Sequence, residues 1–319
     1  MNILLVCDQK IPALLYGGTE RIVWWLGEEL NKRGHKISFL AKSGSTCHFA
    51  KVYTYDPDKM IGEQIPEGID MVHVHFPIEE ELSIPYISTL HGNSKPSQEY
   101  DLNTVFISKN HAERHGSSAF VYNGLDFDEY GSVKWKMKRD HFLFLGKASR
   151  SKKNLKGCVK IAKALNEKLA VIGGRGLPLS KTVRYKGFIG GEKKSRVINQ
   201  SKALLFPVIW HEPFGLAIVE SLYFGAPVFG STYGSLPELI PSEVGVTSNS
   251  YSKLIDAARN YEEYNAKYCH EYVCDSFSVK LMCDGYLKMY DKVLNGHTIN
   301  MSIPIHQESV DIRHYSMDD

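Results

Sequence analysis

The residues of this sequence that could do chemistry gather in the segment Pro207–Glu220, PVIWHEPFGLAIVE. An apolar run before it predicts a strand, and Pro213 suits the first turn of a following helix, where its missing N–H would have no partner. The free amides of Phe214, Gly215 and Leu216 would then face an anion at the positive end of the helix dipole. Because Gly215 has no Cβ, a ligand could approach the backbone closely.

Two carboxylates flank this expected anion site. Glu212 precedes the predicted helix, and Glu220 lies inside it, eight residues later. At about 1.5 Å of rise per residue they would be up to roughly 12 Å apart. Two carboxylates that hydrolyse one glycosidic bond lie roughly 5–9.5 Å apart, so the spacing argues against a glycoside hydrolase. It suits two hydroxyl-bearing rings on either side of a diphosphate, which predicts a nucleotide sugar as the ligand.

The segment Glu212–Leu216, with its second glutamate at Glu220, resembles the EPFG…E motif of glycosyltransferase family 4. Two further segments stand in register with that family, Gly225–Val228 (GAPV) and Gly234–Glu238 (GSLPE). The resemblance covers nearly the whole chain to about residue 294, with a first domain shorter than usual. It implies an α/β protein of the GT-B fold, in which two Rossmann-like domains with parallel sheets face each other across a cleft.

The resemblance also implies a role for each matching residue. In the family, the first glutamate contacts the transferred sugar, the second holds the ribose hydroxyls, and a histidine at the end of a first-domain strand lies close to the sugar. A Gly-Gly loop of the first domain lies at the cleft, beside the donor phosphates and the acceptor. By position, the catalytic residues are Glu212 and His91, the ribose-binding residue is Glu220, Gly18 lies on the donor side, and Gly17 and Glu20 lie on the acceptor side.

Basic side chains are expected to neutralise the diphosphate. In the family this is done by a Gly-Arg pair after the first strand of the second domain and by a lysine about five residues later. Lys147 replaces the arginine here, which keeps the charge but loses the bidentate fork. Lys153 is the expected second base, with Lys152 as the alternative, because the loop length is ambiguous by one residue. Gly187 and Phe188 are expected to line the pocket of the nucleotide base.

Other polar motifs do not indicate a metal. His73 and His75 share one strand face, but no third ligand lies nearby in the sequence. Asp56-Pro57-Asp58 resembles the D-x-D of metal-dependent sugar transferases, yet the central proline and the polar surroundings favour a turn. We therefore expect no metal or other cofactor.

Composition sets the class of protein. With 319 residues and 43% hydrophobic content, the chain can build two cores. A net charge of +2 gives no basic excess of the kind that nucleic-acid binding needs. The six cysteines lack zinc-site spacing, and no apolar run approaches the 18 residues of a membrane span, so we expect a cytoplasmic protein with reduced thiols. The basic segment 134–139 contains apolar residues and suggests peripheral contact with an anionic lipid surface.

Strands and helices are expected to alternate twice along the chain, as in two Rossmann-like domains. We predict the domains at residues 1–130 and 131–276, a helix over about 277–294 that packs back on the first domain, and a polar, loosely held tail over 295–319. The expected strands are Asn2–Cys7, Lys36–Ala41, Asp70–His75, Tyr86–Leu90, Thr104–Ser108, Ala119–Asn123, His141–Leu145, Leu169–Gly173, Arg184–Gly187, Lys202–Pro207 and Ala226–Gly230. The expected helices are Glu20–Arg33, Lys109–His115, Leu155–Asn166, Glu192–Ser201 and further ones between 251 and 295.

The predicted reaction is the metal-independent transfer of a hexose from a nucleoside-diphosphate sugar, with UDP favoured, to a hydroxyl group, with retention of configuration. The acceptor is a glycan, a lipid-linked sugar or a small molecule. Lysines and helix amides would stabilise the charge that develops on the leaving diphosphate. The alternatives are a nucleotide-sugar epimerase of the same fold and a catalytically inactive subunit that binds the nucleotide sugar.

Overall fold

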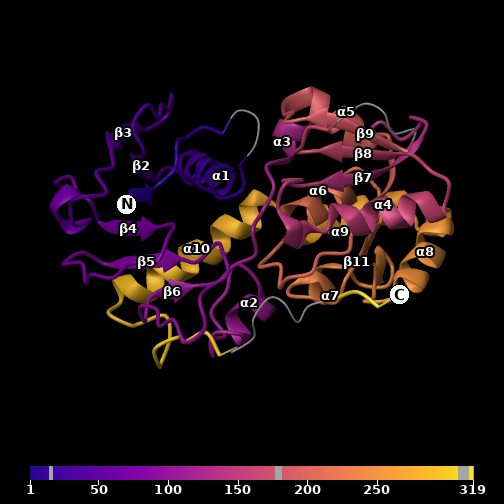
Figure 1. Ribbon diagram of the computed structural model, residues 1–319. Helices are drawn as coiled ribbons and strands as arrows, with labels where there is room; N and C mark the ends of the chain where they lie inside the picture. Colours follow the sequence, from indigo (N-terminus) through magenta and orange to yellow (C-terminus); the bar gives the residue numbers. More distant parts are fainter. Residues whose placement is uncertain (14–16, 177–181, 308–315, 319) are drawn as a thin grey trace. The chain divides into compact units, whose positions relative to one another are not determined.

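A computed structural model describes residues 1–13, 17–176, 182–307 and 316–318 of the chain, which forms two compact units (Figure 1). Among these residues, unit 1 consists of 1–13, 17–125 and 277–307, and unit 2 consists of 126–276 and 316–318. The sequence prediction set the first boundary at residue 130. Residues 14–16, directly before the expected Gly-Gly loop, and part of the tail lie outside the described residues.

Unit 1 contains a six-stranded parallel sheet in the order β3-β2-β1-β4-β5-β6. The apolar strand β1 pairs with β2 on one side and β4 on the other, and this central position explains why it is buried along nearly its whole length. The strands are β1 (Asn2–Cys7), β2 (Lys36–Ala41), β3 (Lys51–Thr54), β4 (Met71–Val74), β5 (Tyr86–Thr89) and β6 (Thr104–Val105).

Two features of this sheet differ from the prediction. The expected strand Ala119–Asn123 is wrong, because the structure forms only a single parallel bridge there, between Phe106 and Phe120. The edge strand β3 was not predicted, because its four residues, KVYT, are half-buried or exposed and give too short an apolar pattern.

The last helix among the described residues, α10 (Val279–Leu294), belongs to unit 1 (Figure 1). It packs against β5 and against α1 (Thr19–Lys32), and its Tyr286 and Tyr290 are fully buried. Gly285 lets α10 lie close to Val121, because a Cβ at position 285 would be only 2.8 Å from the Val121 side chain. The remaining helices of unit 1 are α2 (Lys109–Glu113) and the short 3-10 turn η1 (Gly62–Gln64).

The segment after α10 is not loosely held over its described part in unit 1. Ile299, Asn300 and His306 are buried. The backbone N–H of Asn300 donates to the carbonyl of Leu102 at 2.9 Å, and that of Tyr100 donates to Pro304 at 2.9 Å. The polar composition of the tail hid these contacts, because backbone hydrogen bonds leave no mark on hydropathy.

Unit 2 repeats the same topology with a parallel sheet in the order β12-β11-β10-β7-β8-β9. Its strands are β7 (His141–Leu145), β8 (Leu169–Ile172), β9 (Val183–Gly187), β10 (Ser201–Phe206), β11 (Val228–Gly230) and β12 (Gly245–Thr247). Its helices are α3 (Phe127–Tyr130), η2 (Ser151–Lys153), α4 (Leu155–Ala164), α5 (Gly191–Asn199), α6 (Leu216–Tyr223), α7 (Leu236–Leu239), α8 (Tyr251–Arg259), η3 (Tyr261–Glu263) and α9 (Ala266–Ser276). Among the described residues, no helix has the length and apolar character needed to cross a bilayer.

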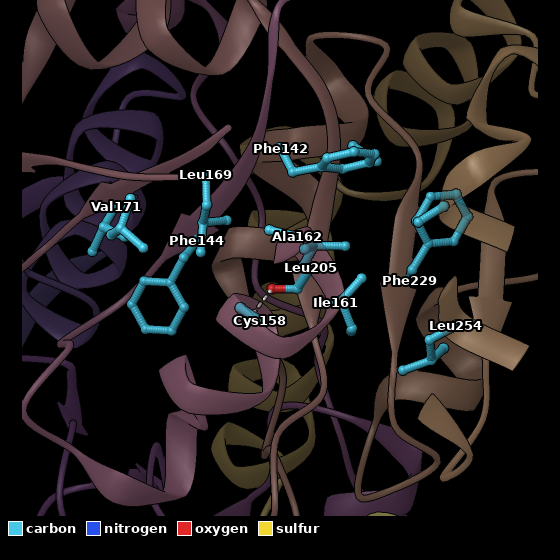
Figure 2. Packing of buried hydrophobic residues seen from close by; sticks show 13 residues of the cluster. Phe142, Phe144, Cys158, Ile161, Ala162, Leu169, Val171, Leu205, Phe229 and Leu254 are labelled. Atoms are coloured by element: carbon cyan, nitrogen blue, oxygen red, sulfur yellow. Dashed lines mark hydrogen bonds between the residues drawn. The ribbon is translucent and has the colours of Figure 1, made fainter. Parts of the chain in front are cut away.

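The core of unit 2 fixes the strands that lead to the candidate site. Figure 2 shows Phe142 and Phe144 of β7 in one buried cluster with Leu205 of β10 and Ile161 of α4. Burial of each such side chain stabilises the folded state by about 1.5–3 kcal/mol. The Sγ of Cys158 donates to the carbonyl of Leu205 at 3.3 Å (Figure 2), and burial raises the pKa of this thiol, so Cys158 is a core residue rather than a reactive one.

Candidate active site

The topology of unit 2 indicates that a ligand would bind at the carboxyl ends of its strands. The strand order reverses between β7 and β10, and open α/β sheets bind ligands outside the carboxyl ends of the strands at such a reversal. The loop after β7 carries Lys147, and the loop after β10 carries Trp210 and Glu212. Asn154 joins the two regions, because its side-chain amide donates to the carbonyl of Pro207 at 2.7 Å.

The helix after β10 begins later than predicted. It starts at Leu216, and Gly215 is its N-cap, with a left-handed backbone at φ 89° and ψ 68°. A Cβ at this position would also lie 2.9 Å from Ile218, so both the backbone conformation and the available space require glycine. Pro213 and Phe214 lie in the loop before the helix, and the expected start at Pro213 is therefore wrong. Phe214 is 1% exposed and anchors the loop in the core.

The second motif segment, GSLPE, supports the loop that carries Glu212. Glu212 and Gly234 form a parallel bridge, and the N–H of Ser235 donates to the carbonyl of Glu212 at 2.9 Å. The N–H of Gly234 donates to Nδ1 of His211 at 2.9 Å. A Cβ at position 234 would lie 2.4 Å from the backbone of Glu212. The two sequence segments therefore form one rigid loop pair.

Glu212 is buried and already paired. Its Oε2 lies 2.5 Å from Nζ of Lys153 and accepts a hydrogen bond from the indole N–H of Trp210 at 2.8 Å. The ammonium group of Lys153 also lies 4.9 Å from the centre of the Trp210 ring, within cation–π distance. The structure thus brings Lys153 to Glu212, whereas Nζ of the alternative base, Lys152, lies 5.5 Å from the same indole ring.

Lys147 lies on the exposed loop after β7. Two backbone hydrogen bonds hold this loop. The N–H of Gly146 donates to the carbonyl of Ile172 at 3.0 Å, and the N–H of Ala148 donates to the carbonyl of Gly173 at 2.9 Å. Gly173 permits this approach, because a Cβ there would lie 2.2 Å from the carbonyl oxygen of Gly146. The backbone that carries the Lys147 side chain is therefore held in a defined conformation.

Glu220, on α6, is only 2% exposed. Nζ of Lys194 on α5 lies 2.6 Å from its Oε1, and the hydroxyl of Tyr130 on α3 donates to the same oxygen. Sequence reasoning missed both partners, because they are 26 and 90 residues away and no motif contains them. The spacing estimate from helical rise does not apply, because Glu212 lies outside the helix that holds Glu220.

Gly187 and Phe188, the residues expected at the base pocket, lie at the end of the edge strand β9. Gly187 has φ 75° and accepts a hydrogen bond from the N–H of Gly173 at 2.8 Å. Phe188 exposes 41% of its surface. The loops after β8 and β9 are therefore joined, and the Phe188 ring stands at their surface.

The remaining predicted residues belong to unit 1. The N–H of Gly18 donates to Oε2 of Glu20 at 3.0 Å, so this carboxylate interacts with the N-terminus of α1. A Cβ at Gly17 would lie 3.0 Å from the same oxygen and 2.7 Å from Ala13. His91 follows β5, and its Nε2 lies 3.0 Å from Nδ1 of His75, which follows β4.

Burial keeps the histidines of this cluster neutral. It lowers the pKa of His91 to about 3, although the residue keeps some exposed surface, and it lowers the pKa of His73 and His75 well below the usual value. The ring nitrogens of His73 bond to Tyr290 and Thr89 at 2.8 Å each. In the described part of the chain, no three histidine, cysteine or acidic residues are grouped so that they could hold a metal ion.

The basic segment 134–139 is only partly available to a surface. The guanidinium of Arg139 donates to the carbonyls of Ser201 at 2.5 Å and Phe224 at 2.7 Å. Trp135 is 44% exposed, and its ring meets that of His270 edge-on. Arg139 therefore stabilises unit 2 through these two hydrogen bonds.

Comparison with known proteins finds similarity to glycosyltransferases, and the family match lies within unit 2. Residues 128–270 match the family described as glycosyl transferases group 1. The chain is 23% identical to N-acetyl-alpha-D-glucosaminyl L-malate synthase of Bacillus anthracis, over 92% of this chain and 97% of that protein. It is 26% identical to an uncharacterized glycosyltransferase, MJ1607 of Methanocaldococcus jannaschii, over 39% of this chain and 38% of that protein.

Solved structures share the fold. AviGT4, a glycosyltransferase involved in avilamycin A biosynthesis, superposes with a TM-score of 0.76 at 22% identity, over 93% of this chain and 99% of that chain. The Anabaena protein Alr3699/HepE, solved in complex with UDP and glucose, superposes with a TM-score of 0.66 at 14% identity, over 91% and 99%.

The two sheets and the similar solved structures define an α/β protein with the GT-B fold, and the match to glycosyl transferases group 1 over residues 128–270 supports the resemblance that the motif indicated.

Proposed function

We propose that this protein is a retaining, metal-independent glycosyltransferase that moves a hexose from a nucleoside-diphosphate sugar to a hydroxyl group of its acceptor. The observation that carries the proposal is the contact between Lys153 and Glu212 at the carboxyl ends of β7 and β10. A buried base and acid, placed at the strand reversal of a nucleotide-binding type of sheet, suit a ligand with an anionic diphosphate and a hydroxylated sugar.

The donor binds through an exchange of partners. Lys153 leaves Glu212 and contacts the diphosphate, together with Lys147 and the backbone amides of Gly215 and Leu216 at the start of α6. The released carboxylate of Glu212, still bonded to the indole of Trp210, then accepts hydrogen bonds from the sugar hydroxyls.

Charge stabilisation provides the catalysis. The bond between the anomeric carbon and the diphosphate oxygen breaks, and negative charge develops on the leaving diphosphate. Two lysines and two backbone amides stabilise that charge without a divalent metal. The acceptor oxygen bonds to the anomeric carbon, and the proton of the acceptor hydroxyl passes to the leaving diphosphate. For the ribose we propose Glu220, which Lys194 and Tyr130 hold in place. Gly187 and Phe188 contact the base.

For the residues of unit 1 we propose the roles that the resemblance implies. His91 contacts the transferred sugar, Gly18 faces the donor phosphates, and Gly17 and Glu20 contact the acceptor. The short hydrogen-bonded turn between Gly18 and Glu20 supports a fixed backbone at this position.

The comparisons favour particular substrates. HepE was solved with UDP and with UDP-glucose, which favours a UDP-sugar as the donor. The name of the Bacillus anthracis relative includes L-malate, which favours a small-molecule acceptor over a glycan or a lipid-linked sugar. We also propose that the protein is cytoplasmic and that the lysines of segment 134–139 make peripheral contact with the membrane.

Thermal denaturation with UDP, GDP, ADP and their sugars, with and without EDTA, tests the donor site. A ligand at 100 times its dissociation constant stabilises the folded state by about 2.7 kcal/mol. We expect the UDP series to raise the melting temperature equally with and without EDTA. A rise that EDTA abolishes contradicts metal independence, and no rise with any nucleotide contradicts the donor site. Conversion of the donor sugar without an acceptor indicates the epimerase.

A further inference from the structure

The two histidines at the ends of β4 and β5 form a close pair. The strands are parallel neighbours, so His75 and His91, which follow them, lie side by side. Nδ1 of His75 is 3.0 Å from Nε2 of His91, and the rings are inclined by 28°. At this distance and orientation the two nitrogens share one hydrogen bond.

This hydrogen bond contains a single proton. Burial lowers the pKa of both rings, so both are neutral near pH 7. A neutral imidazole carries one N–H, and the nitrogen of the other ring must accept. The proton lies either on His75 or on His91.

The second nitrogen of His75 decides between them. His75 is 3% exposed, and its Nε2 contacts no hydrogen-bond partner among the residues that the structure describes. A buried N–H without an acceptor is rarer than an acceptor without a donor. Nε2 of His75 is therefore the bare nitrogen, and Nδ1–H donates to Nε2 of His91. The proton of His91 must then be on its Nδ1.

The neighbouring ring of His73 fixes His75 without competing for this proton. The hydroxyl of Thr89 donates to Tyr286 at 3.3 Å, so its oxygen accepts from Nε2 of His73. Nδ1 of His73 then accepts from the hydroxyl of Tyr290. Both nitrogens of His73 are thus occupied, and its ring lies against that of His75 with centroids 4.0 Å apart.

We propose that His75 is a positioning residue that holds His91 in its neutral Nδ1–H form, so that His91 offers an N–H donor to an oxygen of the transferred sugar. This inference rests on the proposed function, in which His91 contacts that sugar. It explains what the second histidine of the HVH segment does, since sequence reasoning considered it only as a metal ligand.

Two substitutions separate the hydrogen bond from the packing. His75→Leu fills the space but removes the donor, whereas the side-chain amide of His75→Asn places an N–H close to the original Nδ1. Near-ultraviolet circular dichroism of the full-length variants checks that both remain folded.

Long-range ¹H–¹⁵N NMR of the histidine-labelled protein reports which ring nitrogen carries a proton, and His91→Gln assigns the His91 signals. We expect Nδ1–H and a bare Nε2 for His91 in the wild type and in His75→Asn, and a mixture of both tautomers in His75→Leu. A proton on Nε2 of His91 in the wild type overturns the proposal, whatever the activity. So does an unchanged tautomer in a folded His75→Leu.

Release of UDP from UDP-glucose gives the kinetic readout. We expect His75→Leu to lower kcat by about two- to tenfold, the kinetic equivalent of one hydrogen bond, with little change in KM, and His75→Asn to restore most of kcat. An equal loss in both variants overturns the positioning role. A wild-type protein that neither binds UDP-glucose nor releases UDP overturns the proposed function instead, because the NMR result does not depend on turnover.

Discussion

At the scale of single residues, the two glutamates of the motif are held by different partners. Glu212 contacts Lys153 and Trp210, and Glu220 contacts Lys194 and Tyr130. Both glutamates and both lysines are mostly buried, where an ion pair is stronger than at the surface. Glu212 pairs with a proposed ligand-binding base, whereas Glu220 pairs with residues outside the motif, so the two substitutions should have different effects.

Glu212→Ala should lower turnover more than nucleotide binding. The substitution removes the sugar contact and releases Lys153, which can then bind the diphosphate without first breaking an ion pair. We expect the affinity for UDP to stay equal or rise, while the rate of UDP release from UDP-glucose falls. Calorimetry with UDP and steady-state kinetics measure the two quantities. Lost UDP binding with normal turnover would contradict the assignment of Glu212.

Glu220→Ala should weaken nucleotide binding and also destabilise unit 2. Removal of one partner of a buried ion pair typically costs about 3–5 kcal/mol, because the charge of Lys194 is left uncompensated. Urea denaturation measures the stability, and calorimetry with UDP measures the binding.

The double variant Glu220→Ala with Lys194→Met is the control for this effect. It removes the unpaired charge and should recover part of the stability without recovering nucleotide affinity. If UDP affinity returns together with stability, Glu220 acts on the fold and not on the ribose.

At the scale of elements, the turn at Gly215 controls the start of α6 and the backbone of Glu212. Gly215→Ala should destabilise unit 2 by about 1–3 kcal/mol, because alanine at φ 89° is strained and its Cβ would meet Ile218. Gly146→Ala is the matched control, since its Cβ would have ordinary contacts at 3.8 Å or more and its φ is not left-handed. Chemical denaturation of both variants measures the difference. Equal stabilities would show that the loop relaxes without cost.

The sequence predicts the central elements well because burial on both faces leaves a strong apolar signal. β1, β2, β7 and β10 all lie where continuous apolar runs place them, within one residue. The edge strands β3 and β12 were missed, because strands of three or four residues, most of them not buried, carry no such run.

The site is predictable only as far as its residues stand in one contiguous motif. Glu212, Gly215 and Glu220 are visible as a spaced pattern, but Lys194 and Tyr130 come from other helices and depend on the packing of unit 2. The start of α6 was misplaced because proline suits a first helical turn, whereas the left-handed Gly215 actually caps the helix.

At the scale of the whole molecule, unit 1 should lose stability in mild acid. Burial lowers the pKa of His73, His75, His91 and His111 below the ordinary value of 6.5. The unfolded chain therefore binds protons first, so this stability is complete above pH 6.5 and is lost as the pH falls towards the folded pKa. In that window, each such histidine lowers the free energy of unfolding by about 1.4 kcal/mol for each unit by which the pH falls.

Hydrogen exchange between pH 8 and pH 5 measures this effect for each unit. We expect the amides of unit 1 to lose protection progressively below about pH 6.5, the unfolded pKa of histidine. His91→Gln should make this dependence shallower, because one titrating group is gone. Constant protection of unit 1 down to pH 5 would show that the histidines are charged in the folded state.

The place of α10 in unit 1 has a consequence for how the protein is made. All strands and helices that the structure describes in unit 2 lie within residues 127–276, whereas unit 1 needs α10, whose Tyr286 and Tyr290 complete its core. A ribosome therefore delivers every element of the second unit while the first still lacks its closing helix. The nascent sheet of unit 1 must therefore wait, with β5 not yet covered by α10, until residues 279–294 have been synthesised.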